Sequence, residues 1–202
     1  MSPLLSIYLV SLLAALGQDP GAASRRDEAR LLNQSISHSD IGNNLRVWDL
    51  ANNTWRAIQQ SELSNLRSKI LVINLWAHYC KPCIAEFPVL HDIAKQIEGD
   101  TNGVVRFVFI SETSGAADMQ HFCSANAKKL PSEILYLDYN ENIAEGLRQA
   151  LPSASLSLPT TLILDERRVV RYALIGALIH RRSELAAAIT DILRADKLRP
   201  TQ

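Results

Sequence analysis

The chain has 202 residues, of which 47% are hydrophobic and 21% are charged, a composition typical of a folded globular protein. Its 21 Lys and Arg balance 21 Asp and Glu, so the strong basic excess typical of nucleic-acid-binding proteins is absent. Eight Gly and eight Pro exclude collagen-like or Pro/Gly-rich low complexity. No repeat of fixed length is visible, which excludes solenoids and propellers.

The N-terminus carries an apolar run over residues 4–16. This run is too short for a membrane-spanning helix and has the length of a signal-peptide core. Small residues at Ala15 and Gly17 suit a cleavage site, although no Lys or Arg precedes the run. We therefore expect residues 1–17 to form an export signal, with a short uncleaved anchor or a buried N-terminal helix as the alternatives.

The rest of the chain divides into a polar stretch and one domain. Residues 18–44 are mostly polar, so we expect a flexible linker there and a compact domain over residues 45–198. Apolar runs, helical spacing and turn residues predict the elements of that domain. The expected strands are 45–49, 55–59, 70–75, 104–110, 134–137, 160–164 and 169–175, and the expected helices are 82–97, a stretch spanning 119–127, 142–151 and 183–193.

Strands that alternate with helices predict an α/β fold of three layers, with helices on both faces of a mostly parallel sheet. The first strand pair flanks Asn52-Asn53 and the last flanks residues 165–168, so both pairs are expected to be antiparallel hairpins. The central sheet is therefore expected to be mixed. The nearly continuous apolar run at 70–75 indicates a strand that is buried on both faces.

Two of the three cysteines form the motif Cys80-Lys81-Pro82-Cys83. Three cysteines are too few for a disulfide scaffold or for an all-sulfur zinc site. The motif directly follows a predicted buried strand and begins a predicted helix, a position typical of redox proteins. The alternative interpretation is a pair of buried structural thiols.

The N-terminus of a helix presents free N–H groups and the positive end of the helix dipole, both of which favour a thiolate at Cys80. Pro82 is compatible with the first turn of a helix. We expect Cys80 to attack a partner's disulfide and Cys83 to resolve the mixed disulfide. Lys81 is expected either to lower the pKa of the attacking thiol or to be solvated with little effect.

Three further residues are candidates near the pair or elsewhere in the domain. Glu86 lies three residues after Cys83 on the same helix face. If it points inward it can take the proton of Cys83, with a pKa raised by burial, and if it points outward it is a surface acid. Trp76 lies close to the pair in sequence. Cys123 falls on an apolar helical stripe and is expected to be buried, with a second redox role as the alternative.

The segment from Asn74 to Pro88, NLWAHYCKPCIAEFP, resembles the active-site signature of thioredoxin-fold proteins, and more closely that of exported TlpA/ResA-like thiol–disulfide oxidoreductases. The segment LPTTLILD at 158–165 is similar to the cis-proline segment of the same family. The resemblance covers residues 45–193. It implies a thioredoxin-like fold with an N-terminal β-hairpin and an inserted strand and helix at about 104–129.

The resemblance also implies residue roles. Cys80 would be the nucleophile and Cys83 the resolving thiol of a redox-active disulfide. Pro159 would follow a cis peptide bond and face the pair, and Leu158 would offer backbone groups to the substrate chain. Glu86 matches the acid that the family keeps near the pair.

Two other positions bear on the site. Asn74 stands where thioredoxin itself has a buried aspartate. Tyr79 replaces the commoner tryptophan of the family, which is expected to affect the choice of partner.

These observations predict an exported, bacterial-type periplasmic oxidoreductase that reduces protein disulfides, with a role in cytochrome c maturation as one option. We expect a monomer with protein substrates and an upstream thiol electron donor. We expect no cofactor, no metal, no nucleic acid, and membrane association only through an uncleaved N-terminus. The alternatives are a disulfide-forming oxidant, a copper metallochaperone that uses Cys80 and Cys83, and a redox-inert interaction module. No Thr-x-x-Cys motif of the peroxiredoxin type is present.

Overall fold

The computed structural model describes residues 34–35, 46–49, 51–59, 62, 67–111, 115–126, 136–138 and 157–197. The predicted export signal, most of the predicted linker and the helix predicted at 142–151 lie outside the described residues. Among the helices within these ranges, none is long and apolar enough to cross a membrane.

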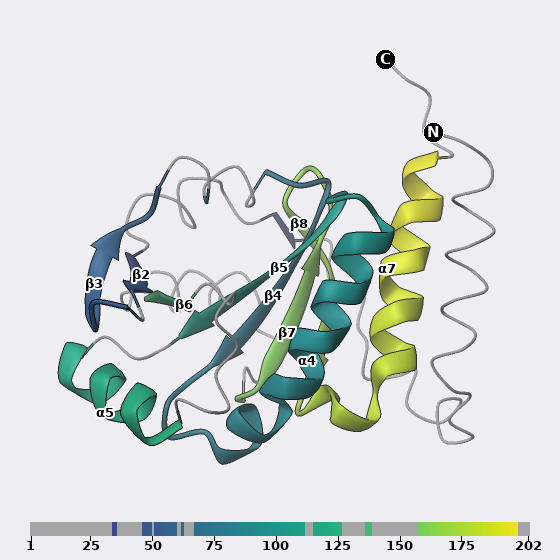
Figure 1. Cartoon of the computed structure of the whole chain (residues 1–202). Helices are drawn as coiled ribbons and strands as arrows, with labels where there is room; N and C mark the ends of the chain where they lie inside the picture. The colour runs from purple at the N-terminus through teal and green to yellow at the C-terminus, as the bar shows by residue number, and fades with distance from the viewer. Residues whose placement is uncertain are drawn as a thin grey trace.

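The described strands form one sheet in the order β1-β8-β7-β4-β5-β6-β2-β3 (Figure 1). Strands β4, β5 and β6 are parallel, whereas β7, β8 and the β2–β3 hairpin add antiparallel pairs, so the predicted mixed sheet is confirmed. The strands are β1 (Gln34–Ser35), β2 (Arg46–Asp49), β3 (Thr54–Ala57), β4 (Ile70–Trp76), β5 (Val105–Ser111), β6 (Tyr136–Asp138), β7 (Thr160–Leu164) and β8 (Val169–Ile175).

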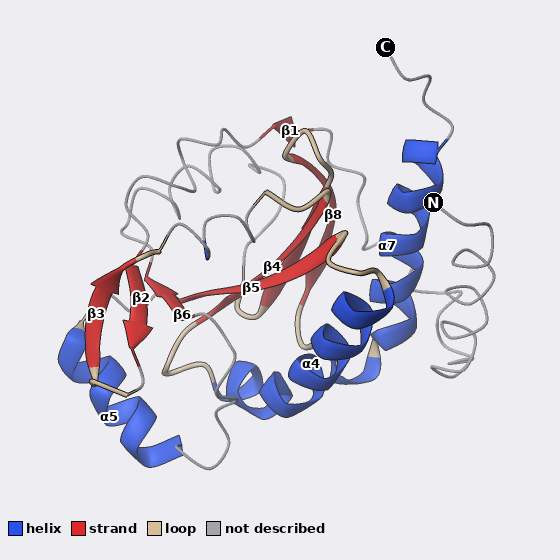
Figure 2. Ribbon diagram, turned by 45° about the horizontal axis from the view of Figure 1, so that its top comes forward, coloured by secondary structure: helices blue, strands red, loops and turns tan. Residues whose placement is uncertain are grey.

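The helices with described bounds are α4 (Lys81–Asp100), α5 (Ala116–Asn126) and α7 (Arg182–Lys197), and a short 3₁₀ helix, η1 (Leu178–His180), precedes α7. Figure 2 shows α4, α5 and α7 on one side of the sheet. They share one hydrophobic core with alternate residues of β4, among them Ile70, Val72 and Trp76. The same three helices were expected from helical spacing, and α4 extends three residues past its predicted end at Ile97.

Both faces of β4 are buried, as the sequence predicts. Leu71, Ile73 and Leu75 point away from the three helices and are also buried. All seven residues of the strand are therefore excluded from solvent. The strand and helix expected at about 104–129 correspond to β5, which pairs with β4 along its whole length, and α5, which packs near the β2–β3 hairpin.

The turn between β7 and β8 is organised by a buried carboxylate. Asp165 is fully buried and accepts hydrogen bonds from the backbone N–H groups of Arg167, at 2.9 Å, and Val169, at 3.1 Å. Its other oxygen forms an ion pair of 2.6 Å with the guanidinium of Arg171. These contacts fix the turn that joins the end of β7 to the start of β8.

Substitution of Asp165 tests this interpretation. The change Asp165→Ala leaves buried donors without an acceptor, so it should lower the free energy of unfolding by about 3 kcal/mol. The exposed neighbour Glu166 is a matched control, and Glu166→Ala should change stability by less than about 0.5 kcal/mol. Urea denaturation of both variants measures the difference. Equal stabilities would show that the carboxylate does not organise the turn.

Candidate active site

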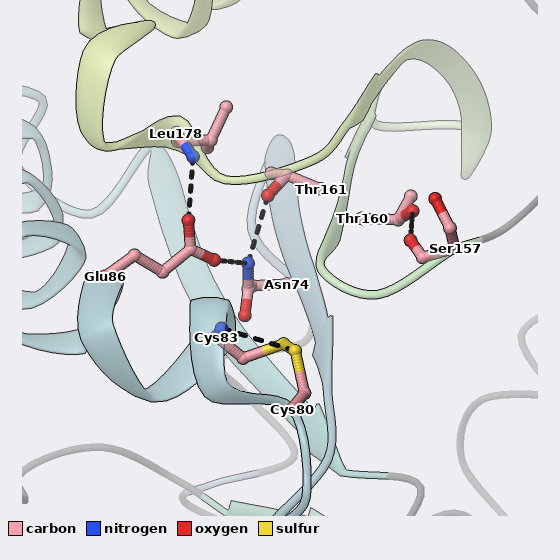
Figure 3. Close-up of a disulfide and its surroundings, with 8 residues drawn as sticks. All are labelled: Asn74, Cys80, Cys83, Glu86, Ser157, Thr160, Thr161 and Leu178. Carbon is pink, nitrogen blue, oxygen red and sulfur yellow. Dashed lines mark hydrogen bonds between the residues drawn. A yellow bond between two sulfur atoms is a disulfide. The ribbon is translucent and has the colours of Figure 1, made fainter.

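The two cysteines lie where β4 ends and α4 begins. After Trp76 the chain turns, Cys80 caps the helix, and α4 starts at Lys81. Cys80 and Cys83 form a disulfide with an S–S distance of 1.97 Å (Figure 3). The Sγ atom of Cys80 also accepts the backbone N–H of Cys83 at 3.2 Å. The predicted strand–CxxC–helix arrangement is confirmed.

The two sulfurs have different environments. The relative solvent-accessible surface of Cys80 is 6%, whereas that of Cys83 is zero. Lys81 and Pro82, between them in sequence, are exposed, and so is Tyr79, at 63%. The two residues next to Cys80 in the chain are therefore both exposed. A helix N-terminus and an N–H donor at Sγ both favour a negative charge on Cys80.

Glu86 points inward, an orientation that its spacing from Cys83 left open. Its side chain is fully buried. One carboxylate oxygen accepts a hydrogen bond of 2.7 Å from the backbone N–H of Leu178. The other accepts a hydrogen bond of 3.2 Å from Nδ2 of Asn74 (Figure 3). The same Nδ2 donates to Oγ1 of Thr161 at 3.1 Å. The network therefore joins α4 to β4, β7 and η1.

Burial raises the pKa of Glu86 from 4.5 to about 7, although its hydrogen bonds with Leu178 and Asn74 act in the opposite direction. Removal of water from a carboxylate disfavours its charged form. A carboxyl group with a pKa near 7 exchanges protons readily at neutral pH, as a general acid or base requires.

The Leu158–Pro159 peptide bond is cis, as the resemblance implies. Thr160 pairs with Leu75 in the sheet, so the proline lies level with the end of β4, close to the turn that leads to Cys80. The carbonyl of Pro159 accepts the backbone N–H of Gly176 at 2.8 Å. Gly176 has a φ of +90°, a conformation that favours glycine.

Trp76 and Cys123 both belong to the packed core. The Trp76 ring is fully buried and contacts the rings of Phe87 and Phe122, with centroids 4.9 and 5.3 Å apart. Cys123 is a buried free thiol, as expected for a small hydrophobic residue. Burial raises the pKa of its thiol to about 11, which makes it a poor nucleophile at neutral pH.

The sequence analysis missed two members of the site. Leu178 donates its backbone N–H to Glu86 from 92 positions away, and backbone groups leave no trace in residue type. Thr161 lies within the proline segment at 158–165, but no spacing rule links it to Asn74. Within the described ranges, no group of three His, Cys, Asp or Glu side chains could hold a metal ion.

Comparison with known proteins agrees with this geometry. The family model described as "AhpC/TSA family" matches residues 41–173. The chain belongs to the AhpC/TSA family. A curated relative, the thioredoxin-like protein YneN of Bacillus subtilis (strain 168), is 27% identical over 130 residues, which cover 62% of this chain and 68% of that protein.

Two solved structures share the fold. A candidate protein disulfide isomerase from Bacteroides thetaiotaomicron is similar, with a TM-score of 0.54 and 14% sequence identity. The matched region covers 82% of this chain and 91% of that protein's chain. A thioredoxin-related protein from Neisseria meningitidis serogroup B has a TM-score of 0.50 and 19% sequence identity. The matched region covers 77% of this chain and 100% of that protein's chain. The AhpC/TSA membership and the CxxC disulfide together make the chain a thioredoxin-like thiol–disulfide oxidoreductase.

Glu86→Gln should change how stability depends on pH. In the folded protein the pKa of Glu86 is about 7, above its ordinary 4.5, so its contribution to stability is complete below pH 4.5 and is lost as the pH rises through 7. Relative to the wild type, the variant should therefore gain roughly 3 kcal/mol of stability between pH 4 and pH 8. Urea denaturation of the disulfide-bonded proteins across this range measures the gain.

The matched control is Asp92→Asn, at an exposed position on the same helix. An exposed carboxylate is not dehydrated by folding, so this variant should show no comparable gain. Parallel pH profiles for the wild type and Glu86→Gln would contradict the assignment of a raised pKa to Glu86.

Proposed function

We propose that the protein reduces disulfides of other proteins in an extracytoplasmic compartment, with the Cys80–Cys83 pair as its redox centre. The observation that carries the proposal is the disulfide at the N-terminus of α4, with Cys80 as the more exposed sulfur. The cis-proline segment level with the end of β4 supports it. There the backbone beside Leu158 is available to align an extended substrate chain.

The proposed reaction has two steps. The Cys80 thiolate attacks one sulfur of the substrate disulfide, and a mixed disulfide forms as a substrate thiolate leaves. Cys83 then loses its proton and attacks the sulfur of Cys80. This step restores the Cys80–Cys83 disulfide and releases the second substrate thiolate. Two electrons pass to the substrate, and an upstream thiol donor returns the pair to the dithiol state.

Glu86 is the proposed acceptor of the proton that Cys83 releases. Its pKa of about 7 suits proton uptake at neutral pH, and it lies on the same helix as Cys83, three residues further along the chain. Figure 3 shows the Asn74 amide between Glu86 and the disulfide. The proposed proton transfer from Cys83 to the carboxylate therefore passes through a bridging water molecule and not through the amide.

The proposed direction of electron flow rests on the likeness of residues 74–88 to TlpA/ResA-like reductants. Proteins of this kind keep apocytochrome cysteines reduced before haem attachment, and cytochrome c maturation is a candidate role here. A reduction potential near that of thioredoxin, about −270 mV, would support a reductant. A potential near about −120 mV would instead favour the disulfide-forming oxidant.

Single-cysteine variants test the catalytic roles. Cys80→Ser should abolish the reduction of insulin disulfides, because it removes the attacking sulfur. Cys83→Ser should accumulate a mixed disulfide with the substrate that dithiothreitol releases, because the resolving sulfur is missing. Mass spectrometry without reductant detects this adduct.

Cys123→Ala is the control for these variants. Its thiol is buried, with a pKa raised to about 11, so its loss should leave the reductase rate within about twofold of the wild type. A Cys83→Ser variant that traps no substrate, or a Cys80→Ser variant that keeps full activity, would contradict the proposed order of attack. One copper ion bound per reduced chain would favour the metallochaperone.

The compartment is tested by the N-terminal segment. Its short apolar run predicts export, so the full chain expressed in a bacterium should be recovered outside the cytoplasm. Deletion of residues 1–17 should retain it inside. Mass spectrometry of the exported protein distinguishes a cleaved signal from a retained anchor. Equal cytoplasmic recovery of both forms would contradict the proposed location.

A further inference from the structure

The side-chain amide of Asn74 has a defined orientation. Its Nδ2 donates to the Glu86 carboxylate at 3.2 Å and to Oγ1 of Thr161 at 3.1 Å. An amide nitrogen has two N–H groups, so both are used. A rotated amide would place its oxygen against the Glu86 carboxylate, where two acceptors would face each other. The network therefore directs Oδ1 of Asn74 to the opposite side.

Oδ1 of Asn74 is buried and has no hydrogen-bond partner among the described residues. Figure 3 shows it on the side of Asn74 that faces the Cys80–Cys83 disulfide. A buried carbonyl without a donor costs about 1–3 kcal/mol, so most such groups in proteins are paired. The disulfide offers no hydrogen to this oxygen, because neither sulfur carries a proton.

Reduction supplies the missing donor. Two electrons and two protons convert the S–S bond into two thiols, and the proton of Cys80 leaves when its thiolate forms. Cys83 has no exposure to solvent, so any hydrogen-bond acceptor for its S–H group is a group of the protein itself. We propose that Asn74 is a positioning residue of the reduced enzyme, and that its Oδ1 accepts the S–H of Cys83.

This hydrogen bond has two consequences. It holds the proton on Cys83 while Cys80 carries the negative charge, and so it keeps the two sulfurs in their separate roles. It also stabilises the dithiol relative to the disulfide, in which the oxygen is unpaired. A stabilised dithiol is a stronger oxidant, so Asn74 raises the reduction potential of the pair.

The S–H stretching band in the Raman spectrum tests the hydrogen bond directly. The double variant Cys80→Ser/Cys123→Ala leaves Cys83 as the one thiol of the chain. Its band should lie at a lower wavenumber than that of a free thiol, and adding Asn74→Leu should move it to the free position. Adding Asn74→Asp instead, which keeps an oxygen there, should retain the bonded position. A free-thiol band in the double variant would overturn the proposal.

The second test is the reduction potential measured against glutathione. In otherwise wild-type protein, Asn74→Leu should lower the equilibrium constant for reduction about three- to tenfold, from the loss of one hydrogen bond. A tenfold change corresponds to about 30 mV. The control is Thr101→Val, which removes a buried hydrogen bond of 2.7 Å to Ile97 at the far end of α4 and should leave the potential unchanged.

An unchanged potential in folded Asn74→Leu would contradict the proposed effect on the pair. If that variant does not fold, the Raman band of the double variant alone decides. The inference rests on the proposed thiol–disulfide exchange, yet its failure is distinguishable from the failure of that function. The band reports the Cys83 proton without any substrate, whereas insulin reduction reports exchange whatever the band position.

Discussion

The buried carboxylate of Glu86 is the constraint on which the site depends. A carboxylate without hydrogen bonds is costly to bury, so the fold surrounds this one with donors from two other elements. One donor is the backbone of Leu178 at the start of η1, and the other is Asn74 on β4. Asn74 also binds Thr161 on β7, so a single polar cluster sets the position of the CxxC helix relative to the proline segment.

The function proposed here depends on a difference between two sulfurs that are joined in one disulfide. Cys80 lies at a helix N-terminus, with an N–H donor at its sulfur and exposed residues around it. Cys83 lies one turn deeper, without exposure to solvent. Charge is therefore favoured on the first sulfur and disfavoured on the second, and this asymmetry gives the exchange reaction its order.

The fold and the partner-facing surface follow different constraints. Solved structures with the same fold share only 14–19% of their residues with this chain, so many sequences meet the packing requirements of the sheet and helices. Close to the disulfide, Tyr79 is largely exposed and its ring packs edge-on against His78, with centroids 5.1 Å apart. These side chains contribute little to the core, and an effect of Tyr79 on the choice of partner stays a prediction.

The sequence by itself determined the local elements: the strand at 70–75, the helix that begins at the CxxC motif and the hairpin after Pro159 were all predictable, because apolar periodicity and turn residues act over short distances. Its two motifs also identified the cysteine pair and the proline. Only the tertiary structure decided that Glu86 points inward, that Leu178 and Thr161 complete its network, and that Asn74 turns its oxygen toward the disulfide. Those contacts join residues up to 92 positions apart, and one of them uses a backbone N–H that every residue except proline carries.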